Sequence, residues 1–115
     1  MSRGDVAFNK FKEGYNCAQA VALAFSDYLD MSDDTVAKLT SGFGGGVGRM
    51  REICGTISGM TFVLSYLYGY SDPKAFEEKS EHYARVQQLA NRFKEYNGSV
   101  VCRELLSLQK KGNDS

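Results

Sequence analysis

The chain has 115 residues and equal numbers of basic and acidic side chains, 14 of each, so its formal net charge is zero. This balance argues against general binding to nucleic acid or to an anionic membrane, because both need an excess of basic charge. Apolar residues make up 43% of the chain, which is enough for one hydrophobic core. We therefore expect a single domain over residues 1–115. The first residues contain no apolar run that resembles a signal peptide, so the cytoplasm is the expected compartment.

The first part of the chain predicts three helices. A short amphipathic helix is expected over about 6–13, where Gly14 is a natural stop. A second helix, over about 17–29, follows an Asn16 cap, and its nearly uncharged interior predicts burial on most of its surface. Ser32 caps a third helix, which ends in a run of glycines.

That glycine run separates the third helix from the most apolar part of the chain. Five glycines lie between residues 42 and 48, and they predict a loop with special backbone geometry, since glycine loses the most backbone freedom on ordering. Apolar residues at spacings of three and four then predict a fourth helix over about 49–68. No charged residue lies between positions 53 and 70, which favours a buried central helix over a membrane span. Gly55 and Gly59 form a bare face on it, where another backbone can approach.

The last part of the chain predicts two more helices. Asp72 and Pro73 indicate the start of a fifth helix, which runs to about Tyr96. Ser99 caps a short sixth helix, and the polar tail, 109–115, is expected to fray. Since no segment alternates polar and apolar residues, the fold class is all-α. We expect a bundle of five or six helices with a glycine-rich loop before the central one.

The three cysteines all lie within about a turn of a predicted helix start. Cys17 follows the Asn16 cap, Cys54 follows the glycine loop, and Cys102 follows the Ser99 cap. Unpaired N–H groups and the helix dipole favour a thiolate at such positions. Three cysteines are too few, and odd in number, for a disulfide framework. Their positions therefore indicate redox or ligand chemistry, and the alternative is that they are small apolar packing residues.

Two further sites are candidates. The glycine loop could cradle an anion through successive N–H groups, helix-start potential and arginine charge. The residues of this predicted nest are Gly44, Gly45, Gly46, Gly48 and Arg49. The alternative is that the glycines only let the loop thread between helices and expose Cys54. The loop has neither a Walker A ending nor the spacing of a dinucleotide fold. His82, the sole histidine, is expected at the surface or boundary of the fifth helix.

Four stretches carry a resemblance to a known family. They are residues 14–21 (GYNCAQAV), 41–49 (SGFGGGVGR), 54–59 (CGTISG) and 101–106 (VCRELL). Together, over about residues 8–107, the chain resembles the family of redox-active proteins named for its cysteine pattern, C_GCAxxG_C_C. The resemblance implies a small helical protein with a redox role, related to a domain of split-Soret cytochromes. Gly59 is one place late for the pattern, and the family's last cysteine is absent, since none follows Cys102.

The leading hypothesis is a thiol–disulfide oxidoreductase in which Cys54 is the central reactive thiol. Cys17 or Cys102 would be its disulfide partner, and a redox partner of unknown identity would exchange electrons with it. The second hypothesis is an iron–sulfur cluster or soft metal held by Cys17, Cys54 and Cys102. No local spacing matches a metal site, so a fourth ligand must then come from elsewhere. The third hypothesis is a structural or regulatory helical module with inert cysteines. A homodimer is compatible with such apolar helices in a small chain.

Overall fold

The computed structural model describes residues 2–114, with side chains for residues 2–108. Over this range it contains six α-helices, two short 3-10 helices and no strand, so the all-α prediction is confirmed. The elements are α1 (Arg3–Lys12), α2 (Cys17–Ala24), η1 (Ser26–Tyr28), α3 (Asp33–Thr40), η2 (Ser41–Phe43), α4 (Gly55–Tyr68), α5 (Phe76–Asn97) and α6 (Cys102–Asp114). The tail that was expected to fray includes Ser115 and the side chains of 109–114, which lie outside the described residues.

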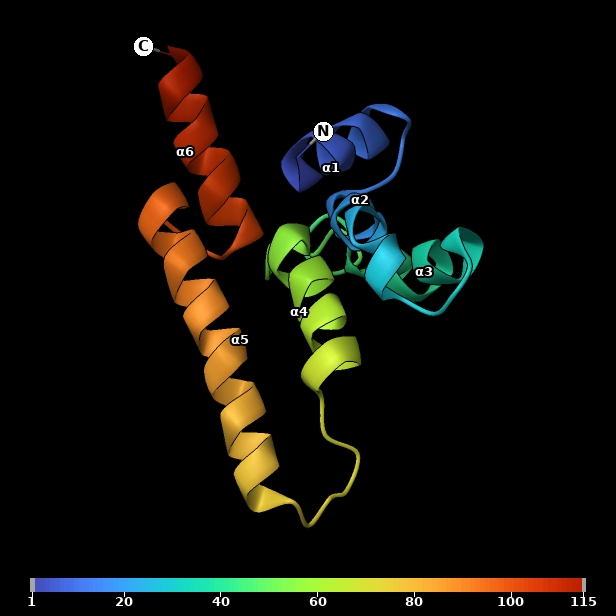
Figure 1. Ribbon diagram of the computed structural model, residues 1–115. Coiled ribbons are helices and arrows are strands. Elements are labelled where there is room, and N and C mark those ends of the chain that lie inside the picture. The colour runs from blue at the N-terminus through green and yellow to red at the C-terminus, as the bar shows by residue number, and fades with distance from the viewer. Residues whose placement is uncertain (1, 115) are drawn as a thin grey trace.

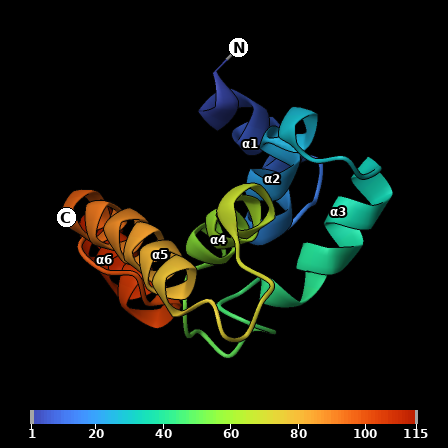
Figure 2. The ribbon, with the colours of Figure 1, turned by 60° about the horizontal axis from the view of Figure 1, so that its bottom comes forward.

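Helix α4 lies between two groups of helices (Figure 1). Helices α1, α2 and α3 lie on one side of it, and α5 and α6 lie on the other, an arrangement that the second view also shows (Figure 2). The molecule is elongated, with extents of 50 × 29 × 27 Å. Helix α2 packs against α1, α3 and α4, and α4 packs against both α2 and α5, so the two nearly uncharged helices occupy the middle as predicted.

Side-chain caps explain where the first three helices begin. Ser2 and Asp5 form a capping box on α1, and Asn16 and Gln19 form another on α2. Ser32 accepts a hydrogen bond from the N–H of Thr35 at the start of α3. The Asn16 and Ser32 caps are therefore as the sequence predicts, while α1 starts three residues earlier than expected, because the Ser2 cap lies outside the apolar pattern.

Helix α2 is shorter than predicted, and an arginine explains where it ends. It stops at Ala24 and gives way to η1. The Arg3 guanidinium donates to the carbonyl of Ala24 at 2.7 Å and to the Asp27 carboxylate at 2.6 and 2.8 Å. It also lies over the ring of Phe25, 4.8 Å from the centroid. These contacts hold α1 against the end of α2 and occupy a carbonyl that a longer helix would use.

Helices α4 and α5 both begin later than predicted. Helix α4 begins at Gly55 instead of near residue 49, because Arg49 and Arg51 have left-handed φ values of 65° and 61°. Helix α5 begins at Phe76 instead of at Pro73. The Asp72 carboxylate accepts the N–H of Lys74 at 2.9 Å, which makes a local turn where a helix cap was expected.

The core lies among α2, α3 and α4. Its buried apolar side chains are Ala22, Leu23, Leu29, Val36 and Val63. The bare face of α4 confirms the predicted close approach: a Cβ added to Gly59 would lie 2.7 Å from the carbonyl oxygen of Ala18 in α2. Glycine therefore sets the spacing of the central helix pair.

No helix in the described part of the chain has both the length and the hydropathy of a membrane span.

Candidate functional site

Two of the cysteines are placed by a single antiparallel bridge between Ile53 and Val101. The N–H of Cys54 donates to the carbonyl of Val100 at 2.8 Å, and the N–H of Cys102 donates to that of Glu52 at 2.5 Å. Side chains alternate along paired extended segments, so Cys54 and Cys102 share the face opposite Ile53 and Val101. Residues 48 positions apart in sequence thus become diagonal neighbours, each at the start of a helix.

The third cysteine meets this pair from α2. Cys17 is the first residue of α2, and a Cβ added to Gly55, the residue after Cys54, would lie 3.1 Å from the Cβ of Cys17. Negative charge on the thiol of Cys54 or Cys102 raises the pKa of the Cys17 thiol, so the three side chains lie near one another. The fold therefore gathers all three sequence-predicted cysteines in one region between α2, α4 and α6. Each is half-buried, and within residues 2–108 none forms a disulfide.

The environment of Cys17 differs from the sequence expectation. Burial raises the pKa of its thiol above the ordinary value of 9.0, and the nearby Cys54 and Cys102 raise it further. A backbone hydrogen bond at the helix start lowers the pKa but is the smallest of these influences. The expectation that a helix start favours the thiolate is therefore wrong for Cys17, because desolvation of the charged form outweighs the helix start.

The glycine run forms a left-handed turn against Cys102. Residues 45–49 have consecutive φ values between 56° and 73°, and Val47 is among them although it is β-branched. The N–H of Glu52 closes the turn by donating to the carbonyl of Gly46 at 3.0 Å. A Cβ on Gly46 would lie 2.7 Å from the Cβ of Cys102. Glycine is needed there both for the left-handed backbone and for room beside the thiol.

A positively charged cavity of about 430 Å³ opens beside this turn. Arg49 and Arg51 line it together with Asn16, which caps the helix of Cys17. Nη1 of Arg51 also lies 3.9 Å from Sγ of Cys102 as a hydrogen-bond donor. Arg51 is absent from the predicted nest residues, although its charge was part of the argument for an anion site, and it is the arginine that contacts a cysteine sulfur.

The predicted anion nest overlaps this cavity only in part. Gly44, Gly45, Gly48 and Arg49 line it. The N–H groups of Gly48 and Arg49 already donate to the carbonyls of Gly42 and Gly44, at 2.8 and 3.2 Å. The attraction for an anion therefore comes from the two guanidinium groups more than from a row of unpaired N–H groups, and the anion site stays a prediction.

The metal hypothesis needs converging ligands. Among the described residues, no three His, Cys, Asp or Glu side chains lie close enough together to hold a metal ion. The cysteines as arranged therefore do not form a ready three-thiolate site. A cluster would require them to move, or donors from another molecule.

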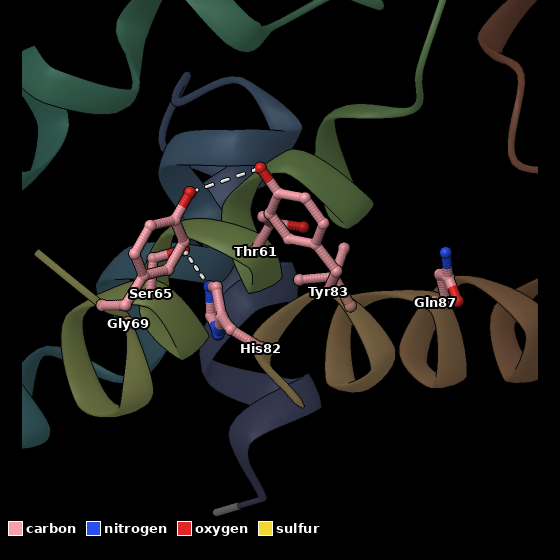
Figure 3. Close-up of a pocket in the computed structure, with 8 residues that line it drawn as sticks. Thr61, Ser65, Gly69, His82, Tyr83 and Gln87 are labelled. Carbon is pink, nitrogen blue, oxygen red and sulfur yellow. Dashed lines mark hydrogen bonds between the residues drawn. The ribbon is translucent and has the colours of Figure 1, made fainter. Parts of the chain in front are cut away.

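A second polar site, which the sequence reasoning missed, lies between α4 and α5 (Figure 3). His82 is only 5% exposed, so the prediction of a surface or boundary position is wrong. Its Nε2 lies 3.0 Å from the hydroxyl oxygen of Ser65 on the facing helix. The signal was in the sequence, because His82 precedes Val86 and Leu89 by four and seven positions on the inner face of α5.

The family comparison covers nearly the whole chain. A family model described as "Putative redox-active protein (C_GCAxxG_C_C)" matches residues 15–115, a range that includes Cys17, Cys54 and Cys102. No curated protein and no solved structure matches the chain.

Proposed function

The chain belongs to the C_GCAxxG_C_C redox-active family, and we propose that it carries out thiol–disulfide exchange with the three cysteines beside its glycine loop. The observation that carries this proposal is the Ile53–Val101 bridge, which puts Cys54 and Cys102 on one face. Two thiols on the same face can form one disulfide once the backbone brings their sulfurs within bonding distance, which thiols on opposite faces cannot do.

Arg51 favours Cys102 as the first nucleophile. Nη1 of its guanidinium lies 3.9 Å from Sγ of Cys102 and can donate to that sulfur during attack. The sequence analysis predicted Cys54 as the central reactive thiol. The contact between Arg51 and Cys102 instead favours Cys102 for the first displacement and Cys54 for the second. Cys17 keeps its proton, because burial raises the pKa of its thiol, and it is the third thiol, able to exchange with the Cys54–Cys102 pair.

The proposed reaction has two displacement steps. The Cys102 thiolate attacks a disulfide RSSR, forms a mixed disulfide and releases RS⁻. The Cys54 thiolate then attacks the sulfur of Cys102, forms the Cys54–Cys102 disulfide and releases a second RS⁻. The two thiol protons of the protein pass through water to the two released thiolates. The protein loses two electrons, and one RSSR gains them to become two RSH.

The cavity lined by Arg51, whose guanidinium also contacts Cys102, favours an anionic disulfide as substrate. Arg49 and Arg51 give it positive charge, and its volume of about 430 Å³ suits a small molecule more than a protein segment. Carboxylate groups on the substrate would pair with the guanidiniums and bring the disulfide to the thiol.

Reaction with 5,5′-dithiobis(2-nitrobenzoate), an anionic disulfide, tests the assignment. The reduced protein should release two thiolates for each Cys54–Cys102 pair oxidised, whereas Cys54→Ser should stop at the mixed disulfide on Cys102. Attack by Cys102 should give a fast first phase of thiolate release. Cys102→Ser should lose this fast phase, and Arg51→Gln should slow it. Arg92→Gln removes an exposed arginine of α5 and serves as the control. An unchanged fast phase in Cys102→Ser would refute the order of attack, and thiols that react only after unfolding would refute the whole proposal.

A second experiment distinguishes thiol–disulfide exchange from metal binding. Purification without oxygen, followed by visible absorption and elemental analysis, would reveal iron or another soft metal bound to the thiols. Stoichiometric metal would favour the cluster hypothesis over exchange chemistry.

A further inference from the structure

The cavity around His82 is separate from the thiol site and has an unexplained polar atom. His82 is 5% exposed, and its Nδ1 has no hydrogen-bond partner among the described residues. A buried polar atom without a partner costs free energy, so it needs an explanation such as a bound group. Figure 3 shows Ser65 and His82 facing each other across the α4–α5 interface, with Tyr83 beside them.

Hydrogen-bonding capacity in this cavity exceeds what its own residues use. A neutral imidazole and a serine hydroxyl together have two protons, and the contact between His82 and Ser65 uses one. Tyr70 and Tyr83 also have two, and their hydroxyl oxygens are 3.4 Å apart, which again uses one. Hydrogen bonding with Tyr83 raises the pKa of Tyr70, so its phenol stays protonated. Each pair therefore has one proton left for a ligand.

The shape and charge of the cavity limit the ligand class. Its volume is about 620 Å³, and none of its described lining residues carries a full charge unless His82 is protonated. A charged ligand would lose its hydration without compensation. The Tyr70 ring stands edge-on to both His82 and Tyr83, at centroid distances of 6.5 and 6.3 Å, which gives the cavity aromatic walls. These features suit an uncharged planar ring with oxygen substituents.

A second cavity extends the first along the same helix pair. It has a volume of about 570 Å³ and shares Thr61, Ser65 and Val86 with the first cavity. Its other walls are mainly aliphatic and aromatic, with Ile57 and Phe62 among them. The two together form a groove with a polar end at His82 and an apolar end towards the glycine loop. An amphipathic ligand with a ring and an apolar tail fits this order.

We propose that the groove between α4 and α5 binds a quinone, with the ring between His82, Tyr70 and Tyr83 and the apolar side chain in the second cavity. The phenol pair donates a hydrogen bond to one ring carbonyl. The imidazole and Ser65 meet the other oxygen, so that the buried Nδ1 of His82 gains a partner. This proposal concerns binding and does not rest on the thiol chemistry.

The sole histidine makes binding directly measurable. Its imidazole gives one set of long-range ¹H–¹⁵N signals, which can be followed while ubiquinone-1 is added. This quinone has a prenyl tail, and its ring is fully substituted, so thiols cannot add to it. We expect a saturable shift of the His82 signals. Tyr83→Phe should weaken binding about fivefold, the effect of one hydrogen bond. Tyr96→Phe makes the same change at an 82% exposed tyrosine outside the groove and should leave binding unchanged.

Other occupants predict different results. Lys79 lies 5.7 Å from the centroid of the Tyr83 ring, so benzoate tests whether any anionic ring binds as well. Benzoate binding as tight as ubiquinone-1 would overturn the quinone assignment. Signals that change with protein concentration alone would show that a second copy of the chain fills the groove. Unchanged His82 signals up to the solubility limit of ubiquinone-1 would overturn the proposal, with the Nδ1 atom then solvated by water.

Discussion

The two sides of α4 are packed in different ways. Towards α2, Gly55 and Gly59 let backbone meet backbone, and Ala18 is completely buried. Towards α5, side chains such as Ser65 meet His82 across a groove with two cavities. One helix thus presents a bare face to one neighbour and a side-chain face to the other. The tight side holds together the helix starts that carry Cys17 and Cys54, and the loose side leaves room for a ligand.

Leucine truncation on either side of α4 gives the largest contrast. Leu23 in α2 is 3% exposed, and Leu106 in α6 is 40% exposed. Leu23→Ala should lower the free energy of unfolding by about 3 kcal/mol, because it leaves a cavity in the core. Leu106→Ala should cost less than about 1 kcal/mol. Urea denaturation measures both. Equal losses would mean that α6 is packed as tightly as α2, which would contradict the comparison.

Adding one methyl group at the tight interface should cost nearly as much. Gly59→Ala would place a Cβ 2.7 Å from the Ala18 carbonyl oxygen. We expect a loss of about 2 kcal/mol, because the two backbones must separate.

Gly4→Ala is the matched control for this change. The new Cβ would lie 3.7 Å from the hydroxyl oxygen of Ser2, which is ordinary contact. Higher helix propensity should then stabilise the protein by up to about 1 kcal/mol. Thermal unfolding of both variants should show opposite signs, and two stabilised variants would mean that α2 and α4 are not held at backbone contact.

The glycine turn extends the comparison to the thiol site. Gly46→Ala and Gly48→Ala both put alanine at a left-handed φ, 73° and 56°, which costs about 1 kcal/mol. A Cβ at position 48 would meet no described atom within 4 Å, whereas one at position 46 would meet Cys102 at 2.7 Å. Gly46→Ala should therefore cost about 1 kcal/mol more and change the rate at which Cys102 reacts with an anionic disulfide. Identical stability and reactivity of the two variants would show that the turn does not position the thiol.

Much of the fold could be predicted from local signals. Caps and periodicity gave the helices, and the glycine pair gave the α2–α4 contact at Gly59. The predictions failed where a distant residue decides. Arg3 ends α2 from 21 positions away, and the left-handed turn before Gly55 delays α4 although the apolar spacing continues through it. Periodicity describes which residues are buried, but it does not show which backbone carbonyls and dihedral angles are already committed.

The candidate site shows the same division. Placing Cys17, Cys54 and Cys102 at helix starts followed from caps and the glycine run. Their meeting depends on the Ile53–Val101 bridge, and two extended residues in a helical chain leave no periodic signal. The charge of a thiol was harder still to predict, since the helix start and burial act in opposite directions at Cys17 and only the fold decides which is larger.

The smallest expected effect concerns that same thiol and the pH dependence of stability. Burial raises the pKa of Cys17 in the folded state above its unfolded value, so the thiol form is favoured by folding. Its contribution to stability is then fully present below about pH 9 and is lost as pH rises through the folded pKa. Urea denaturation from pH 7 to 10.5 should show the wild-type protein losing stability more steeply than Cys17→Ala. Parallel curves would mean that the tight side of α4 admits water to Cys17 and does not exclude its charge.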